Sequence, residues 1–596
     1  MKSSIADIGR ALIGRLGVRL AGQRGKSPDR APDYPWLAAY PSGVDWSEGI
    51  EVRALHTVVD DAARRFAENR CVDFFGKTYT YREIGEQVNR AAKGLRHLGV
   101  GKGVKVGLCL PNTPYAVICY YAILKAGGTV VNYNPLYVER ELAHQVEDSE
   151  TDIMITLDLE QIYPKVAALL TSTRLRHVVV CRMSDILPTL KGLLFSTLKA
   201  SEVADIPDDV QHIPFASLTN NDGAVTPPEI DPGQDVAVLQ YTGGTTGVPK
   251  GAMLTHANLS ANLTQVRRWV GGFREGEERI LGVLPLFHVF GMTLVMNLGI
   301  ASGSELILLP RFELDDLLKA VDRSRATVLM GVPTIYTAIV SAPNLETYDL
   351  TSIKYCISGG APLPMALKRS FEAITGCVLV EGYGLSESAP VATSNPFDGV
   401  NKEGSVGIPL PGTVVEIRDI EAPERQMPLG EKGEVCIAGP QVMTGYWRRP
   451  DETAKTIVDG RLHTGDVGYM DDDGYIFLVD RMKDLILCGG FNVYPRVIEE
   501  AILLHPAVLE TTVIGVSDEY RGETPKAFVK LGQGQSLDEA ELKAFLGDKL
   551  SPIEMPEYIE FRDELPKMLI GKLLKKELAA EEAAKTGPAT EEQVEP

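Results

Sequence analysis

Segments with strand and helix patterns alternate along most of the chain, and this alternation constrains the fold more than any other feature. Residues 104–110, 129–132 and 152–156 are short apolar runs typical of buried strands, and helical patterns at 115–127 and 138–149 lie between them. Neighbouring parallel strands need a crossover connection, which is usually a helix. The sequence therefore predicts an α/β fold with mainly parallel sheets.

The same alternation divides the chain into domains. It is interrupted at 183–230 by an insertion with an amphipathic piece and a polar, Pro-rich connection. Residues 401–480 are richer in short strands and Gly turns, which predicts a small β subdomain. The tail is rich in Ala and Glu from Glu577 onward, a composition typical of disorder. We expect an N-terminal extension over 1–46, a large domain of two α/β subdomains and the β subdomain over 47–480, a small mobile α+β domain over 481–578 and a disordered tail over 579–596.

Charge and cysteine usage exclude some classes of function and location. The formal net charge of −20 disfavours nonspecific binding of nucleic acid. The eight cysteines are scattered, without a CxxC pair or a Cys/His cluster of metal-ligand spacing, which favours a reducing cytoplasm. No apolar run reaches the roughly 18 residues of a transmembrane helix.

Two segments bear on peripheral membrane contact. Residues 1–26 place apolar side chains at helical spacing among basic ones, and residues 186–199 have a similar apolar pattern. A basic amphipathic helix can lie on a membrane surface, here the inner face of a membrane, but it can equally pack on its own domain. Both interpretations stay open at this point.

The most specific motif spans residues 241–251, with the sequence Tyr-Thr-Gly-Gly-Thr-Thr-Gly-Val-Pro-Lys-Gly, and follows a predicted strand. Glycines let backbone amides approach an anion closely, the Thr hydroxyls add donors, and Lys250 adds a positive charge. This pattern predicts a phosphate cradle. It is not a Walker A loop, because Pro249 precedes the lysine and Gly251 follows it.

This string resembles the phosphate loop of the adenylate-forming superfamily, which includes acyl-CoA synthetases, firefly luciferases and peptide-synthetase adenylation domains. The resemblance extends over roughly residues 50–578, and within the superfamily the chain looks most like long-chain fatty-acid–CoA ligases. Further motifs match in order at 284–288, 331–334, 358–361, 381–387, 464–466, 480–483 and 566–572. One departure is that residues 568–570 are more apolar than the small polar residues usual in that loop.

The resemblance implies a two-step reaction with ATP, Mg²⁺ and coenzyme A. A hydrophobic carboxylic acid, here a long-chain fatty acid, would attack ATP to give acyl-AMP and pyrophosphate. The acyl group would then pass to the thiol of coenzyme A with release of AMP. Two alternatives stay open: a fatty-acyl-AMP ligase that delivers the acyl group to a carrier protein, and a silent binding or scaffold protein on the same fold. A homodimer stays open as well.

The resemblance also implies roles for individual residues. Lys572 would stabilise the negative charge that builds at the α-phosphate, Glu387 and Thr242 would hold Mg²⁺, and His288 would position the carboxylate. The implied nucleotide contacts are Thr242, Gly243, Gly244, Thr245, Thr246, Gly247, Lys250, Gly359, Gly360, Ala361, Glu381, Gly382, Tyr383, Gly384, Ser386, Asp466, Arg481 and Lys572. The implied hinge is Lys483, the coenzyme A tunnel Gly489, Gly490, Phe491 and Asn492, and the acyl pocket His288, Met292, Gly331 and Val332.

Overall fold

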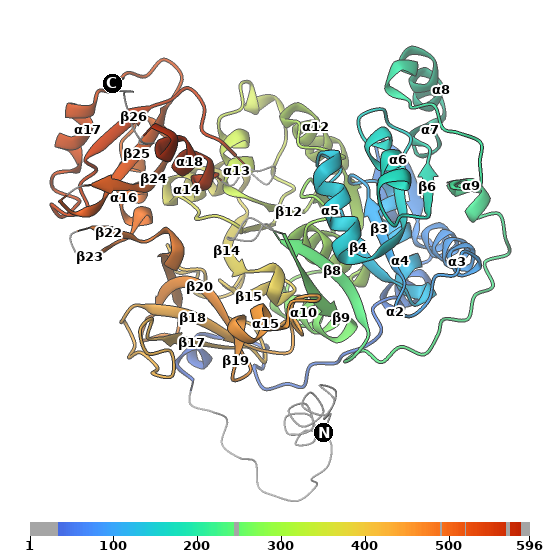
Figure 1. Ribbon diagram of the computed structural model, residues 1–596, viewed down its shortest axis with the longest axis horizontal. Helices are drawn as coiled ribbons and strands as arrows, with labels where there is room; N and C mark the ends of the chain where they lie inside the picture. Colours follow the sequence, from blue (N-terminus) through green and yellow to red (C-terminus); the bar gives the residue numbers. More distant parts are fainter. Residues whose placement is uncertain (1–33, 243–248, 489–490, 519, 568–572, 586–596) are drawn as a thin grey trace, which may run out of the picture.

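The computed structural model describes residues 34–242, 249–488, 491–518, 520–567 and 573–585, which form four sheets with helices around them (Figure 1). The predicted amphipathic segment 1–26 lies outside the described residues. The α/β fold class with mainly parallel sheets is confirmed. No helix in the described part of the chain has the length and apolar character needed to cross a bilayer.

The first large sheet has seven strands in the order β7-β6-β5-β3-β4-β8-β9, all parallel except for the β8–β9 pair. Its strands are β3 (Lys105–Cys109), β4 (Thr129–Asn132), β5 (Thr151–Leu157), β6 (His177–Cys181), β7 (His212–Pro214), β8 (Val236–Thr242) and β9 (Lys250–Thr255). Its crossover helices are α4 (Pro114–Ala126), α5 (Glu139–Ser149) and α6 (Tyr163–Ser172). Every residue of α4 is buried, because this helix packs between the sheet and α3 (Tyr81–His97).

The predicted insertion at 183–230 takes part in this sheet. It contributes the edge strand β7 and the short helices α7 (Met183–Ile186), α8 (Thr189–Leu198) and α9 (Phe215–Leu218). In Figure 1, α7 and α8 extend from the edge of the molecule opposite the C-terminal domain.

The second large sheet has nine strands in the order β16-β15-β14-β13-β12-β10-β11-β1-β2, with a parallel centre and antiparallel edges. Its strands are β1 (Arg70–Phe74), β2 (Lys77–Thr80), β10 (Arg279–Gly282), β11 (Glu305–Leu308), β12 (Val328–Gly331), β13 (Tyr355–Ser358), β14 (Val378–Gly384), β15 (Val391–Ser394) and β16 (Ile408–Pro409). The flanking helices are α2 (Thr57–Arg65), α10 (His256–Trp269), α11 (Leu298–Ala301), α12 (Leu314–Ser324), α13 (Pro333–Val340) and α14 (Met365–Thr375). One continuous core cluster joins this sheet to the first, so the two α/β units pack as one body.

A smaller antiparallel sheet follows, in the region where the sequence predicts a β subdomain. It consists of β17 (Val414–Arg418), β18 (Gly433–Ala438), β19 (Ile457–Val458), β20 (Arg461–Met470) and β21 (Ile476–Arg481), with α15 (Pro450–Thr456) beside it. Strand β21 leads directly into the C-terminal domain through the short helix η6 (Met482–Asp484).

The C-terminal domain has its own sheet and its own core. Its elements are β22 (Ile486–Cys488), β23 (Phe491–Val493), β24 (Val508–Asp518), β25 (Gly522–Leu531) and β26 (Tyr558–Phe561), with α16 (Pro495–Leu503), α17 (Glu539–Leu546) and α18 (Lys575–Lys585). Its apolar cluster, which includes Ile498, Val529 and Leu542, is separate from that of the large domain. A domain with an independent core can turn as a unit.

The expectation of a disordered tail from Glu577 is wrong for residues 577–585, which belong to helix α18. Leu578 is fully buried against Ile514 and Phe528, and Glu582 pairs with Lys526 at 2.8 Å. Alanine and glutamate have high intrinsic helix propensity, and one buried leucine anchors the helix to the sheet. Residues 586–596 lie outside the described part of the chain.

Candidate active site

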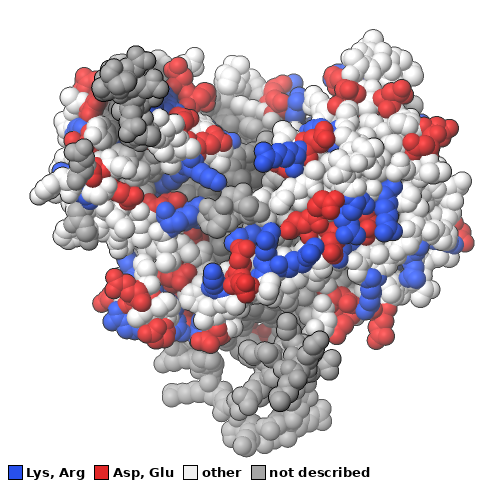
Figure 2. All heavy atoms as spheres, viewed as in Figure 1, with Lys and Arg blue, Asp and Glu red and all other residues white. Residues whose placement is uncertain are grey.

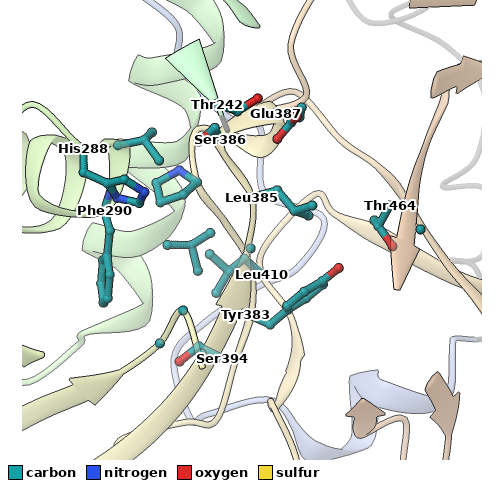
Figure 3. A pocket seen from close by; sticks show the side chains of 18 of the residues that line it. Thr242, His288, Phe290, Tyr383, Leu385, Ser386, Glu387, Ser394, Leu410 and Thr464 are labelled. Atoms are coloured by element: carbon teal, nitrogen blue, oxygen red, sulfur yellow. The ribbon is translucent and has the colours of Figure 1, made fainter. Parts of the chain in front are cut away.

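A cavity of about 580 Å³ lies where the two large sheets, the small sheet and the segment 481–483 meet. Figure 3 shows polar side chains on one side, where Thr242, Ser386 and Glu387 gather, and His288 with Phe290 on the other. The predicted site residues that line it are Thr242, Lys250, His288, Gly359, Gly360, Gly382, Tyr383, Gly384, Ser386, Glu387, Arg481 and Lys483. Gly243, Gly244, Thr245, Thr246, Gly247, Gly489, Gly490 and Lys572 lie outside the described residues.

The polar end of the cavity is built around Glu387, in the short helix η5 (Ser386–Ser388) after β14. The hydroxyl of Tyr446 donates to Glu387 Oε1 at 2.8 Å and holds the carboxylate beside the cavity. Lys250 pairs with Glu452, and its Nζ lies 5.2 Å from the centroid of the Tyr446 ring. Carboxylate and hydroxyl oxygens are the hard donors that Mg²⁺ prefers. Glu387 and Thr242 therefore fit the magnesium site that the sequence predicts.

A second polar group connects Tyr383, Asp466 and Arg481. The Tyr383 hydroxyl donates to Asp466 Oδ2 at 2.6 Å, and Arg481 Nε lies 2.9 Å from Asp466 Oδ1. Asp466 is only 5% exposed, and these partners hold its carboxylate in place. Burial, and then the nearby Asp466 charge, raise the pKa of Tyr383, so that its phenol stays neutral. An aromatic face thus lies beside a fixed carboxylate. The ring can stack on a nucleobase, and the carboxylate can accept hydrogen bonds from ribose hydroxyls.

The opposite end of the cavity is apolar. His288 lies there, and burial lowers the pKa of its imidazole to about 4, so the ring is neutral near pH 7. A neutral ring can position a carboxylate but gives it no positive charge. Ten apolar side chains form the surrounding wall: Val266, Trp269, Val270, Val289, Phe290, Leu294, Ile357, Pro390, Val391 and Leu410. Of these, Val266 and Trp269 lie near the C-terminal end of α10, and Trp269 Nε1 donates to Asn395 O at 3.1 Å.

Several predicted site residues stand behind the cavity wall. Met292, in the π-helix η3 (Gly291–Asn297), is fully buried, and its sulfur accepts a hydrogen bond from Asn132 at 3.5 Å. Gly331, against which the ring of Tyr336 packs, does not line the cavity, and neither does Val332. Of the four residues predicted for the acyl pocket, only His288 lines this cavity.

Three predicted nucleotide contacts, Ala361, Glu381 and Asp466, also lie outside the lining. Glu381 is buried and accepts a hydrogen bond from the backbone of Leu363 at 3.3 Å. Burial raises the pKa of Glu381 to about 7, while the nearby Arg496 opposes this shift. Glu381 thus belongs to the packing between the large domain and α16, whereas its neighbours Gly382 and Tyr383 face the cavity.

The junction between the domains borders the cavity. Lys483, the predicted hinge, lines it, and burial lowers the pKa of this lysine. Just before it, Asp480 accepts hydrogen bonds from the backbone amides of Arg481 at 2.8 Å and of Arg496 at 2.7 Å. Phe491 and Asn492, predicted for the coenzyme A tunnel, are exposed on β23 and do not line this cavity.

The polar lining residues that sequence analysis missed include Tyr446, Glu434 and His463. Glu434 Oε2 lies 2.7 Å from His463 Nδ1, and Cys436 Sγ lies 3.5 Å from the same ring nitrogen. These groups come from two different strands, so no local Cys/His spacing in the sequence predicts that they lie together. They are the one group of metal-ligand type among the described residues, but here the histidine ring is already bonded to the carboxylate.

Comparisons with known proteins agree with this architecture. The family model for the AMP-binding enzyme matches residues 59–447, and that for the AMP-binding enzyme C-terminal domain matches residues 497–572. A long-chain-fatty-acid–CoA ligase of Bacillus subtilis (strain 168) is 45% identical over 551 residues, covering 92% of this chain and 98% of that protein. A long-chain-fatty-acid–CoA ligase of Escherichia coli O157:H7 is 38% identical, with the same coverage.

Solved structures give the same picture. The crystal structure of ATP-bound MatB from Rhodopseudomonas palustris aligns with a TM-score of 0.78 at 31% identity, over 89% of this chain and 99% of that one. The anthranilate CoA ligase AuaEII in complex with anthranoyl-AMP aligns with a TM-score of 0.80 at 25% identity, over 91% of this chain and 100% of that one.

Proposed function

Because the chain belongs to the AMP-binding enzyme family, we infer that it is an acid–thiol ligase that joins a long-chain fatty acid to coenzyme A at the expense of ATP. The first half-reaction forms acyl-AMP and releases pyrophosphate, and the second forms the thioester and releases AMP. The observation that carries this function is a single cavity that Tyr383 and Glu387 line, with Asp466 bonded to Tyr383 beside it, and that continues into an apolar wall.

Different residues at the nucleotide end would bind different parts of ATP. We assign the adenine to the face of Tyr383 and the ribose hydroxyls to Asp466, which Arg481 holds in place. Glu387 and Thr242 would hold Mg²⁺, which supplies positive charge to the phosphate oxygens when bound. Lys250 and the segment 243–247 would receive the phosphates, so ATP binding would replace the pairing of Lys250 with Glu452.

The first half-reaction needs charge stabilisation and not a general base, because a fatty-acid carboxylate is already ionised near pH 7. Its attack on the α-phosphate brings two anions together, so a positive group aimed at that point lowers the barrier. We assign this role to Lys572. The neutral His288 would orient the carboxylate at the mouth of the apolar end.

The second half-reaction needs a different geometry, because the thiol has to reach the carbon that the adenylate activates. We propose that the C-terminal domain turns about Lys483 and brings 489–492 to the cavity. Such a turn has to break the bond between Asp480 and the backbone amide of Arg496, which joins the two domains.

The phosphates of both ATP and coenzyme A need cations. Lys and Arg side chains, interspersed with acidic ones, run across the middle of the face in Figure 2.

The apolar wall is our candidate for the acyl site, and it replaces the predicted set around Met292. Burying one methylene of the substrate contributes about 0.8 kcal/mol, or about fourfold in kcat/KM. We expect Val266→Phe to shorten the preferred acid, lowering kcat/KM for palmitate by at least fourfold while octanoate is little affected. Leu263→Phe, on the same helix but outside this lining, is the matched control. An unchanged chain-length profile for Val266→Phe would place the acyl chain elsewhere.

We propose a cytoplasmic protein that touches the membrane peripherally, and α8 is the described segment that supports this. Leu190, Leu193 and Leu198 are 69%, 64% and 78% exposed. Helix α8 also contains no acidic residue, although the chain as a whole is acidic. A lipid surface accepts such a helix and also holds the fatty-acid substrate.

Sedimentation with phosphatidylcholine–phosphatidylglycerol vesicles tests this contact. We expect Leu190, Leu193 and Leu198 changed together to Ser to lower vesicle affinity at least tenfold, because each leucine loses part of the roughly 1.5–3 kcal/mol of burial. Leu487→Ser, which alters a 58% exposed leucine of the C-terminal domain, is the control. Undiminished sedimentation of the triple variant would assign any membrane contact to another segment, and removal of residues 1–26 would show whether it is the N-terminus.

Product analysis tests the function itself. The protein is mixed with ATP, Mg²⁺ and a panel of acids from acetate and cinnamate to palmitate and oleate, with and without coenzyme A. We expect acyl-AMP from the long acids alone, converted to acyl-CoA when coenzyme A is added. Acyl-AMP that persists with coenzyme A would point to a carrier-protein acceptor, and no adenylate from any acid would point to a silent protein.

A further inference from the structure

The small sheet contains an irregularity next to the predicted ribose contact. Strands β18 and β20 pair in register at Cys436 with His463 and again at Glu434 with Val467. Between these pairs, the single residue Val435 faces residues 464–466 of β20. The extra residues form a bulge, and Gly465 at its centre has a positive φ of 71°. A bulge re-aims a side chain but leaves ladder hydrogen bonds unmade.

Side chains replace the missing ladder bonds in this bulge. Glu434 Oε1 accepts the backbone N–H of Gly465 at 3.0 Å, and Glu434 Oε2 bonds His463 Nδ1 at 2.7 Å. The hydroxyl of Thr464 donates to Val435 O at 2.6 Å and accepts the N–H of Asp466 at 3.0 Å. Glu434 is only 7% exposed, so its carboxylate depends on these partners for compensation of its lost hydration.

The residue that this bulge presents is Asp466. From the bulge its carboxylate reaches Tyr383 and Arg481, and Asp466 is also the residue that pairs with Arg481 in the ladder between β20 and β21. Glu434 and His463 border the same cavity, but Glu434 bonds to the Gly465 amide of the bulge and to His463.

From this arrangement we infer that Glu434, with His463 as its partner, is a positioning residue that fixes the 464–466 bulge and so aims Asp466 at the ribose. The inference rests on the proposed function, because it assigns the ribose of ATP to Asp466. Glu434 acts through the backbone of Gly465 and through His463, and does not itself touch the nucleotide.

The test compares nucleotides that differ only in their ribose. Kd values for ATP and for 2′,3′-dideoxy-ATP are measured by calorimetry on the full chain, for the wild type, Glu434→Gln and Glu434→Ala. Glu434→Ala should bind ATP about tenfold or more weakly, since a hydrogen bond to a charged group is lost, while dideoxy-ATP binding changes little. Glu434→Gln keeps an acceptor for the Gly465 amide and loses only the charge that faces His463. Its Kd for ATP should therefore lie between those of the wild type and Glu434→Ala.

Glu416→Ala is the matched control, because it removes a half-buried carboxylate of the same sheet. Glu416 pairs with Arg418 and Arg461 and does not line the cavity. This control should lower thermal stability but leave the preference for ATP over dideoxy-ATP intact. If Glu434 had only a structural role, Glu434→Ala would likewise lose thermal stability but keep its preference for ATP over dideoxy-ATP. A preference as large as that of the wild type in Glu434→Ala would therefore overturn the inference.

These readouts separate the inference from the function on which it rests. If the wild type binds ATP but forms no acyl-AMP, the proposed function fails while the effect of Glu434 on ribose discrimination is still measured. If the wild type binds ATP and dideoxy-ATP equally, the assignment of the ribose to Asp466 is wrong, and the positioning role of Glu434 is overturned with it.

Discussion

Replacing Asp466 by Ala should lower kcat/KM for ATP in acyl-AMP formation by at least about 100-fold. The carboxylate would lose two hydrogen bonds to the ribose, and hydrogen bonds to charged groups contribute about 1.5–3 kcal/mol each, with 1.4 kcal/mol for every tenfold. The variant also leaves the Tyr383 hydroxyl and the Arg481 guanidinium without the partner that holds them. Acyl-AMP measured by mass spectrometry at several ATP concentrations gives the ratio directly.

Two further variants show which part of the Asp466 effect is specific to the site. Asp471→Ala breaks a carboxylate–lysine pair with Lys402 at the end of the same sheet, away from the cavity lining, and should leave kcat/KM for ATP within about twofold of the wild type. Tyr383→Phe keeps the aromatic face and removes one hydrogen bond to the Asp466 carboxylate, worth about 1.5–3 kcal/mol. Because Asp466→Ala removes more than one such bond, the loss in Tyr383→Phe should be smaller. If Asp466→Ala and Asp471→Ala lowered kcat/KM for ATP equally, Asp466 would contribute only to the stability of the fold.

The fold was predictable because its parallel strands are buried on both faces and appear in the sequence as short apolar runs. Val130, Ile155 and Val179 lie in such runs and are fully buried. The nucleotide end was predictable for another reason. Residues 381–387 and 464–466 are short local motifs, so their resemblance to a known family could be recognised along the chain, and the structure brings Tyr383 and Glu387 to one cavity.

The remainder depends on contacts between distant segments. Which face of α10 borders the cavity is set by the packing of three sheets, and no local pattern distinguishes Val266 from Leu263. Met292 lies near His288 in sequence but points into the core, because a π-helix sets its direction. The Glu434–His463 pair arises across two strands and a bulge, and strand periodicity alone predicts neither the register shift nor the side chain that compensates it.

Lys572→Ala should separate the two half-reactions. Removing one group that stabilises developing charge typically lowers kcat by about 10²–10³-fold, so acyl-AMP formation from ATP and palmitate should fall by at least that factor. ATP binding should persist, because Tyr383 and Glu387 in the cavity lining and Asp466 beside Tyr383 remain in place. Thioester formation from supplied palmitoyl-AMP and coenzyme A should stay within a few-fold of the wild type, because the second step involves no attack on a phosphate. Both steps are followed by mass spectrometry in single-turnover reactions.

The decisive control is another lysine of the same region. Lys572 lies outside the described residues, and its role comes from its position in the C-terminal motif, whereas Lys576 is exposed on α18. If the region acts only as a diffuse basic surface, Lys576→Ala should impair adenylation about as much as Lys572→Ala, and added salt should narrow the difference from the wild type. If one ammonium group meets the α-phosphate, Lys576→Ala should match the wild type in both half-reactions. A Lys572→Ala protein that still adenylates palmitate at the wild-type rate would remove this lysine from the mechanism and leave Lys250 and the segment 243–247 as the sources of phosphate stabilisation.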